Sequence, residues 1–436
     1  MRTQPIGNGL LVAHVAQHHA AVLAALQLQG ARVDELLSLD DAEWGKTLAL
    51  CDRLRLTLPL ALRPCKRFPD WVSERLMKNL ADVVRRFARV QATYCEAAAA
   101  LARAGVPHLV LKGFTQSPDF VKAPQFRMQG DIDFYAPREH TQAALDAFTA
   151  IGYEPAGPPE EYRYADHPPT MMRFRGWKWS GNRFDPELPL AIEVHICLWN
   201  PQVSLIALPE VDDFWNRRIG RRLGDLSFCS LDPIDQLGYF ALHLLRDLFP
   251  GLGLVVHHAL ELATFLNGRA DDDAFWQEWE ARYSPRLKQM QAIAFALAGA
   301  CFSSRLPDAV EEQIHRLPAA QRAWIERCGG DLLAETFCRT RDGRLLQFLL
   351  ANSAAARRKV LWRAVSPGVI ASPRKVANRP EYPAAPQTRR QWRPWRYPAY
   401  LASRIFFNGA AVLRLIANSV TVFLWSLAGP GEARYQ

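Results

Sequence analysis

Two carboxylates, Asp131 and Asp133, stand one residue apart in the segment 130–134, Gly-Asp-Ile-Asp-Phe. Side chains alternate between the faces of a β-strand, so both would point the same way, about 7 Å apart, while Ile132 would point into the core. Like charges placed in this way repel each other unless a cation separates them or they share a proton. Mg²⁺ is commonly held by one or two carboxylates together with substrate phosphates. The pair therefore predicts a Mg²⁺ site, with Mn²⁺ as the alternative ion and solvated strand-end carboxylates as the alternative interpretation.

A third carboxylate, Glu193, lies sixty residues after Asp133 in the apolar segment 190–199. Strand periodicity would place Glu193 and His195 on one face and apolar side chains on the other. One strand that offers Asp-x-Asp and a neighbour that offers a third acid can hold two metal ions for phosphoryl or nucleotidyl transfer. His195 is then either a structural histidine beside the sheet or a group that orients Glu193 or the acceptor.

Basic residues and glycines lie close to the acids in the sequence. Lys112 and Gly113 end a short apolar segment before the acidic pair, and Arg127 and Gly130 directly precede it. A lysine and an arginine beside three acids suit an anionic, metal-bound substrate. A glycine before the acids permits close approach of the backbone or of a ligand. The consecutive histidine pairs at 18–19 and 257–258 have no metal-ligand spacing, and His243 is interpreted as a core residue of its helix.

The elements that must position these residues follow from the hydrophobic pattern. Apolar residues at three- and four-residue steps predict a long helix over 70–104. Strands are predicted at 108–111, 131–136, 171–179 and 190–199. Pro137 should end the second strand and begin a helix over 138–151. Further helices are predicted at 233–249, 254–267, 271–283, 286–303, 308–327 and 331–352.

The acidic segments also carry a resemblance to a known family. The motifs LVLKG (109–113), FRMQGDIDFY (126–135), Gly-Tyr at 152–153 and IEVH (192–195) occur in this order. This series resembles the uncharacterised nucleotidyltransferase family within the polymerase-β-type nucleotidyltransferase superfamily. The resemblance covers roughly residues 75–300.

The resemblance implies an α+β fold, in which a small mixed β-sheet core is flanked by helices and followed by a mostly helical C-terminal half. It implies metal-dependent transfer of a nucleoside monophosphate from an NTP to an acceptor, which could be a small molecule, a peptide, a protein or an RNA end. Asp131, Asp133 and Glu193 would hold the metal and carry catalysis. The predicted nucleotide-binding residues are Lys112, Gly113, Arg127 and Gly130, with His195 behind the metal ligands.

The chain is expected to divide into four parts. These are an N-terminal helical region (1–69), the nucleotidyltransferase-like core (70–232), a helical domain (233–353) and a basic, Pro/Arg-rich linker with an apolar helix (354–436). The net charge of +9 comes from the end of the chain, where residues 351–436 hold 14 Lys and Arg against two Glu. Such a tail can meet nucleic acid, an anionic membrane or an acidic partner.

Tryptophans and arginines of the tail precede a long apolar segment, 400–428, that contains Arg414 and Asn418. A spanning helix needs about 20 residues with few or no charges. The segment is therefore expected to pack on the body of the protein or to contact a membrane surface peripherally through residues 389–428.

The competing functions are a non-catalytic nucleotide-binding protein and an interaction protein that docks on a membrane. The short apolar run at the N-terminus does not resemble a signal peptide, and the eight scattered cysteines suggest reduced thiols. A cytoplasmic location is expected, with peripheral contact at the inner face of the membrane as the alternative.

Overall fold

The computed structural model describes residues 9–365 except 64–66, 159–161, 163–164, 174–175, 250–252 and 330–341, together with 398, 402, 409, 412–414 and 416–424. The helices before the sheet are α1 (Gly9–Ala25), α2 (Asp34–Leu37), α3 (Asp41–Leu54), α4 (Thr57–Ala61) and α5 (Asp70–Arg103). The helices after it are α8 (Pro233–Leu248), α9 (Val256–Gly268), α10 (Asp273–Arg282), α11 (Pro285–Phe302), α12 (Asp308–His315), α13 (Ala319–Cys328), α15 (Asp342–Leu350) and α16 (Ala354–Val365).

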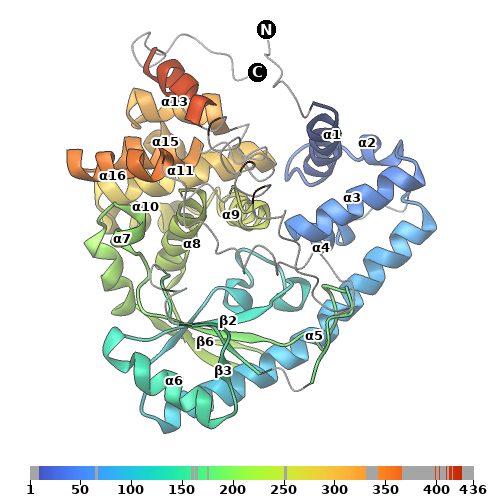
Figure 1. The fold of residues 1–436 in the computed structure, drawn as a ribbon, viewed down its shortest axis with the longest axis vertical. Coiled ribbons are helices and arrows are strands. Elements are labelled where there is room, and N and C mark those ends of the chain that lie inside the picture. The colour runs from blue at the N-terminus through green and yellow to red at the C-terminus, as the bar shows by residue number, and fades with distance from the viewer. Residues whose placement is uncertain are drawn as a thin grey trace.

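The central sheet has five strands in the order β1-β2-β5-β4-β3 (Figure 1). Their bounds are β1 (Leu109–Leu111), β2 (Asp131–Tyr135), β3 (Glu154–Pro155), β4 (Met171–Met172) and β5 (Ala191–His195). The strands β2 and β5 pair in parallel, whereas the other neighbours pair antiparallel. The sheet is therefore mixed, and the predicted α+β class with a helical C-terminal half is confirmed.

Alternating side chains give the sheet two different faces. One face carries Val110, Ile132 and Phe134, which pack in one core with α5 and with α6 (Thr141–Ala150). The other face carries Leu111 and Tyr135, which belong to the core of the C-terminal helices. In Figure 1, α5 and α6 lie below the strands, and α8 and α9 lie above them. Residues on the second face, including the acids of β2, are thus turned toward the helical half.

Several short elements connect the strands and helices. They are the 3-10 helices η1 (Gly113–Gln116), η2 (Pro124–Phe126), η3 (Arg138–His140) and η5 (Pro209–Trp215), and the helix α7 (Pro201–Ser204). A two-stranded hairpin, β6 (Ile219–Leu223) and β7 (Leu226–Ser230), was not expected from the sequence. Its turn is Gly224-Asp225, with Gly224 at a φ of 58°, a conformation that glycine adopts readily.

Two of the expected elements are corrected. Of the strand expected at 171–179, the described residues form β4 at 171–172, and residues 176–179 are irregular. The helix expected at 308–327 is two helices, α12 and α13, because Pro318 cannot continue the first. Part of the helix expected at 331–352 lies outside the described residues, and α15 accounts for the rest.

The N-terminal helices pack on the C-terminal ones. Trp44 and Leu48 of α3 are buried in the same core as the residues of α8, α9 and α11. The backbone N–H of Leu28 donates to the carbonyl of Phe302 at 2.9 Å. One core therefore runs through parts of the chain that are far apart in sequence, and the four-part division proposed above stays a prediction.

The described part of the C-terminal apolar segment contacts the body of the protein. Asn418 donates to the buried Asp342 carboxylate at 2.5 Å, and Arg414 lies 3.3 Å from the other carboxylate oxygen. Val422 is buried in the main core. Most of residues 389–411 lie outside the described residues. Among the helices that the structure describes, none has the length and apolarity needed to cross a bilayer.

Candidate active site

Strand register places two of the predicted catalytic acids side by side. In the parallel pair of β2 and β5, Asp133 lies opposite Glu193, and Tyr135 lies opposite His195. Ligand atoms of Asp133, Glu193 and His195 all lie within 4.8 Å of one another, close enough to hold one metal ion. Asp131, two residues earlier on β2, lines the same cavity as Asp133 and Glu193.

Asp133 is the most strongly held of these acids. Its Oδ1 lies 3.1 Å from the Lys112 ammonium and accepts a 2.8 Å hydrogen bond from His195 Nε2. Glu193 accepts a 2.9 Å hydrogen bond from the Thr170 hydroxyl and lies 3.5 Å from His167 Nε2. The carboxylates of Asp133 and Glu193 therefore both have partners that fix their orientation before any ligand binds.

An unusual backbone conformation brings Lys112 to Asp133. Lys112 has a φ of 47° and directly follows β1, and Gly113 has a φ of 58°. A non-glycine residue with positive φ is strained, by about 1–3 kcal/mol, and such strain is often found at functional sites. A Cβ on Gly113 would lie 2.4 Å from Nε2 of Gln129, and this Nε2 donates to the Asp131 carbonyl at 2.8 Å. Gly113 thus lets the turn pack closely against the strand that carries the acids.

The two aspartates have opposite pKa shifts. Burial and the neighbouring Asp133 charge raise the pKa of Asp131. Burial would also raise the pKa of Asp133, but Lys112 and His195 outweigh it, so its pKa is held well below the usual range. Lys112 and Arg55 relieve this repulsion at Asp131 only in part, and a bound cation would relieve it further. The neighbouring carboxylates of Asp133 and Glu193, with Asp131 on the same cavity wall, are oxygen donors that fit Mg²⁺ or Mn²⁺.

The acids open into a cavity of about 420 Å³ whose walls come from three distant parts of the chain. Arg53 and Arg55 come from the end of α3, and Lys112 and Arg127 come from the loops around the sheet. The third wall is formed by α8, α9 and the residues between them, namely His243, Arg246, Asp247, Leu254, Val255, Val256, His257 and His258. Five cations and four acids line the cavity, a mixture suited to a metal-bound polyphosphate.

The predicted nucleotide-binding residues differ in their surroundings. Lys112 and Arg127 line the cavity, whereas Gly113 and Gly130 are not among its lining residues. The Arg127 guanidinium makes two hydrogen bonds to Glu261 of α9, at 2.7 and 3.3 Å. Arg127 therefore ties the loop before β2 to the helical half at the edge of the cavity.

Sequence reasoning missed the contribution of the flanking helices. Arg53, Arg55, Arg246 and the histidines of α8 and α9 were not predicted to lie at the site, although they line the cavity. One signal was available for part of this set. His243 and Asp247 are four residues apart within a predicted helix, a spacing that places both side chains on the same face.

A match to a known protein family covers the part of the chain that forms the cavity. A sequence model described as "Uncharacterised nucleotidyltransferase" matches residues 40–303, which is more than half of the chain. The chain therefore belongs to the uncharacterised nucleotidyltransferase family. The matched region begins earlier than the motifs alone indicated and includes α3, whose end reaches the cavity. No curated protein and no solved structure matches the chain detectably.

Proposed function

We propose that this protein transfers a nucleoside monophosphate from an NTP to an acceptor, with Asp131, Asp133 and Glu193 as metal ligands. The observation that carries the proposal is the pairing of Asp133 with Glu193 across β2 and β5, with Asp131 on the same cavity wall. Family membership supports the reaction class. The acceptor remains open among small molecules, peptides, proteins and RNA ends.

The three acids fit hard divalent cations, Mg²⁺ or Mn²⁺. Bound there, such ions would neutralise phosphate charge and polarise the reacting phosphorus centre. His195 holds Asp133 through its Nε2, which is the arrangement expected of a residue that orients a ligand carboxylate. Glu193, which accepts a hydrogen bond from Thr170, would act as a general base that takes the proton of the acceptor hydroxyl or amine.

Cations of the cavity would bind the triphosphate. Burial would lower the pKa of Lys112, but the Asp133 charge outweighs it, and the pKa lies above its usual value. Lys112 therefore stays protonated and can neutralise phosphate oxygens. Arg55 makes no side-chain hydrogen bond or ion pair with the described residues and lines the same cavity. It is thus available for a phosphate group. The Arg127 guanidinium is already hydrogen-bonded to Glu261, so Arg127 would bind a phosphate only while it keeps this pairing.

Thermal unfolding with each NTP, with and without Mg²⁺, tests the site. A ligand at about 100 times its Kd should stabilise the wild type by about 2.7 kcal/mol. The shift should require Mg²⁺ and should be lost in the double variant D131A/D133A. Asp146 is an exposed acid of α6, and the variant D146A should behave as the wild type. A Mg²⁺-dependent shift that persists in D131A/D133A would refute the assignment.

A non-catalytic, nucleotide-binding protein is the alternative on the same scaffold. It would show the same Mg²⁺-dependent shift but would form no product. Incubation of the protein with labelled NTP and a broad set of acceptors separates the two functions. Label transferred by the wild type and not by D131A/D133A would support transfer, whereas tight binding without any product would support the alternative.

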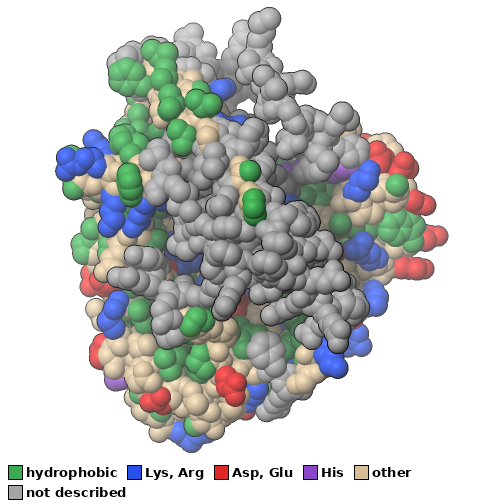
Figure 2. Space-filling view, in the orientation of Figure 1, with side chains coloured by type: hydrophobic (Ala, Val, Ile, Leu, Met, Phe, Trp, Pro, Cys, Tyr) green, Lys and Arg blue, Asp and Glu red, His purple; other side chains and the backbone are tan. Residues whose placement is uncertain are grey.

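A second candidate function is peripheral docking on an anionic membrane, favoured by an exposed apolar surface. Leu361 and Trp362 of α16 and Leu413, Ile416, Val420, Phe423 and Leu424 of the C-terminal segment are exposed. Figure 2 shows apolar side chains gathered at the upper left, over the C-terminal helix, with Lys and Arg side chains beside them. Exposed Arg358 and Lys359 adjoin Leu361 and Trp362 on α16, so the charge suits anionic lipid.

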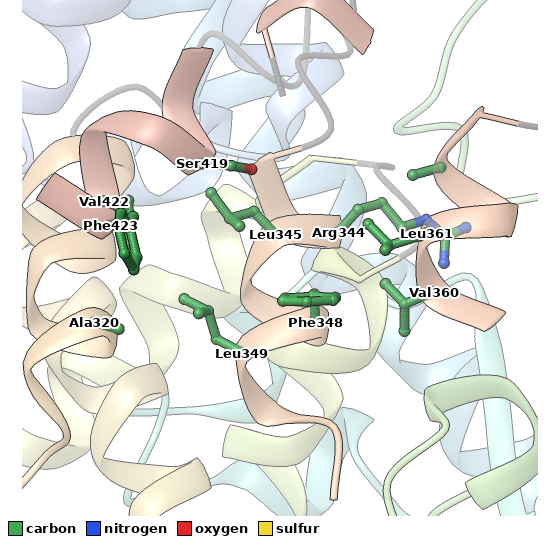
Figure 3. Close-up of a pocket in the computed structure, with 11 residues that line it drawn as sticks. Ala320, Arg344, Leu345, Phe348, Leu349, Val360, Leu361, Ser419, Val422 and Phe423 are labelled. Carbon is green, nitrogen blue, oxygen red and sulfur yellow. The ribbon is translucent and has the colours of Figure 1, made fainter. Parts of the chain in front are cut away.

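An apolar hollow of about 290 Å³ lies within this surface. Figure 3 shows side chains from several helices around it, among them Phe348 from α15, Val360 from α16 and Val422 from the C-terminal helix. Sedimentation of the full chain with anionic vesicles tests the contact. Binding should be lost in W362D/V420D and kept in M77D, which changes an exposed apolar residue of α5. Equal sedimentation of both variants would refute the contact.

A further inference from the structure

A second group of potential metal ligands lies in the cavity, apart from the three acids. His243 and Asp247 are one turn apart on α8, and His258 lies in the first turn of α9. One ligand atom from each of these residues lies within 4.8 Å of the other two. The His243 and His258 ring centroids are 5.1 Å apart. All three residues line the cavity that contains Asp131.

The two imidazoles carry unmet hydrogen-bonding capacity. Nδ1 of His243 and Nδ1 of His258 are buried and have no hydrogen-bond partner in the described part of the chain. Both side chains are more than nine-tenths buried. A buried polar atom without a partner is costly and calls for an explanation such as an ion or a ligand. Burial also lowers the pKa of both histidines far below the usual value, which keeps the rings neutral, as metal ligation requires.

The two carboxylate oxygens of Asp247 face different neighbours. Its Oδ2 faces His243 Nε2 at 3.9 Å, and its Oδ1 faces Arg246 at 3.4 Å. Arg246 pairs more closely with Asp166. The Arg246 charge is therefore largely met by Asp166, and the Oδ2 side of Asp247 is left for the two histidines.

We propose that His243, Asp247 and His258 form a second cation site, selective for a transition metal of the Zn²⁺ type. Two imidazole nitrogens and one carboxylate oxygen are ligands that Zn²⁺ accepts in tetrahedral sites with a fourth, open position. Imidazole favours Zn²⁺ over Mg²⁺, whereas carboxylates favour Mg²⁺. The cavity thus holds two ligand sets of different chemistry, and the site does not depend on nucleotide transfer.

The open position of this second site faces the same cavity as the acids. An oxygen of a phosphate or of an acceptor could complete the coordination there. The role of the site can therefore be either structural, by tying α8 to α9, or substrate-binding. Both roles require that the metal binds in the absence of NTP, which makes binding of Zn²⁺ alone the decisive measurement.

Calorimetric titration of the full chain with Zn²⁺, in excess Mg²⁺, tests the proposal. One Zn²⁺ should bind per chain, and H243Q and H258Q should each weaken binding by about 100-fold or remove it. H315Q changes an exposed histidine at the end of α12 that does not line the cavity, and this variant should bind Zn²⁺ as the wild type does. Metal content after dialysis gives a second readout, and thermal unfolding in a chelator shows whether each variant folds. Equal Zn²⁺ binding by H243Q, H258Q and wild type, or no binding by the wild type, would overturn the proposal.

The variant D131N separates this proposal from the proposed function. It should lose the Mg²⁺-dependent NTP shift and keep full Zn²⁺ affinity. Conversely, H258Q should lose Zn²⁺ binding and keep binding of Mg²⁺ to the acids. If D131N lost both activities, the two ligand sets would form a single site, and the proposal of a second one would be wrong.

Discussion

The residue that separates this site from an ordinary strand end is Asp131. Asp133 has Lys112 and His195 as partners, whereas Asp131 has a raised pKa because of burial and the Asp133 charge. Two carboxylates with opposite shifts are typical of sites that place charge for chemistry and not for stability. At neutral pH the apo protein therefore keeps an electrostatic penalty at Asp131, which a bound cation would remove.

The variant D131N should make the apo protein more stable at neutral pH and inactivate it. A raised pKa means that ionised Asp131 destabilises the fold, and this destabilisation grows as pH rises above about 4, the unfolded pKa. Thermal unfolding without metal should therefore give a higher Tm for D131N than for wild type at pH 7 and equal values near pH 3. Transfer should fall by about 10³-fold, or about 4 kcal/mol. A lower apo Tm for D131N at pH 7 would contradict this account.

The variant D133N should have the opposite effect on stability. The lowered pKa means that ionised Asp133 stabilises the fold above the unfolded pKa of about 3.9, and that this contribution is lost as pH falls through the folded value. Removing one partner of a buried pair costs about 3–5 kcal/mol. Urea unfolding should show this loss at pH 7 and a shrinking difference below about pH 4. A difference that does not depend on pH would refute the electrostatic explanation.

At the scale of elements, sequence periodicity identified the framework of the site. The helix α5 (Asp70–Arg103) and the strands β2 and β5 begin and end within four residues of their predicted bounds, because long apolar periods and β-branched runs are strong local signals. The shared face of Glu193 and His195 followed from strand alternation alone, and His195 Nε2 lies within 3.9 Å of carboxylate oxygens of both Asp133 and Glu193.

Other parts of the site depend on contacts that no local pattern encodes. Arg53 and Arg55 approach the acids because α3 packs against the C-terminal helices, which is a tertiary contact. The backbone of Lys112 has positive φ although lysine does not favour it, because the surrounding structure enforces it. His243 and His258 meet only through the packing of α8 on α9. The two-stranded sheet β6–β7 was missed because its strands are short and polar residues interrupt their apolar pattern.

Gly113 makes a prediction at this scale. The variant G113A should destabilise the protein by about 1–3 kcal/mol, because it adds a Cβ at positive φ that overlaps the buried Gln129 side chain. The displaced amide would also release the Asp131 carbonyl. A Cβ on Gly130 would meet no heavy atom of the described residues within 4 Å, so G130A should change urea-unfolding stability by less than about 0.5 kcal/mol. If G113A and G130A lost the same amount of stability, the close packing of Gly113 against Gln129 would not explain the effect of G113A.

At the scale of the whole molecule, the C-terminal helix is held on the body by a buried polar contact. The Asp342 side chain is fully buried and accepts from Asn418 and Arg414. The expectation that the apolar segment packs on the body holds for the described residues, which also present exposed apolar side chains on their outer side. The C-terminal helix can thus be held on the body of the protein through Asp342 and still present an exposed apolar surface on its other side.

The variant N418A should destabilise the protein by about 1–3 kcal/mol, because a buried carboxylate loses a donor. V420A, two residues away on the exposed side, should change stability by less than about 0.5 kcal/mol. Urea unfolding of the full chain measures both. An N418A effect no larger than that of V420A would mean that the contact with Asp342 does not hold the helix.

The cavity has a consequence for how the protein acquires its activity. Its walls include Arg55, Asp131, Glu193 and His258, so more than two hundred residues separate the first wall from the last. Contacts of such sequence separation form late, because closing long loops costs entropy before the contacts are made. A chain emerging from the ribosome would therefore complete its β-strands well before it could bind a nucleotide. The proposed binding of nucleotide would thus arise late in folding, and a partly folded chain would lack the complete site for it.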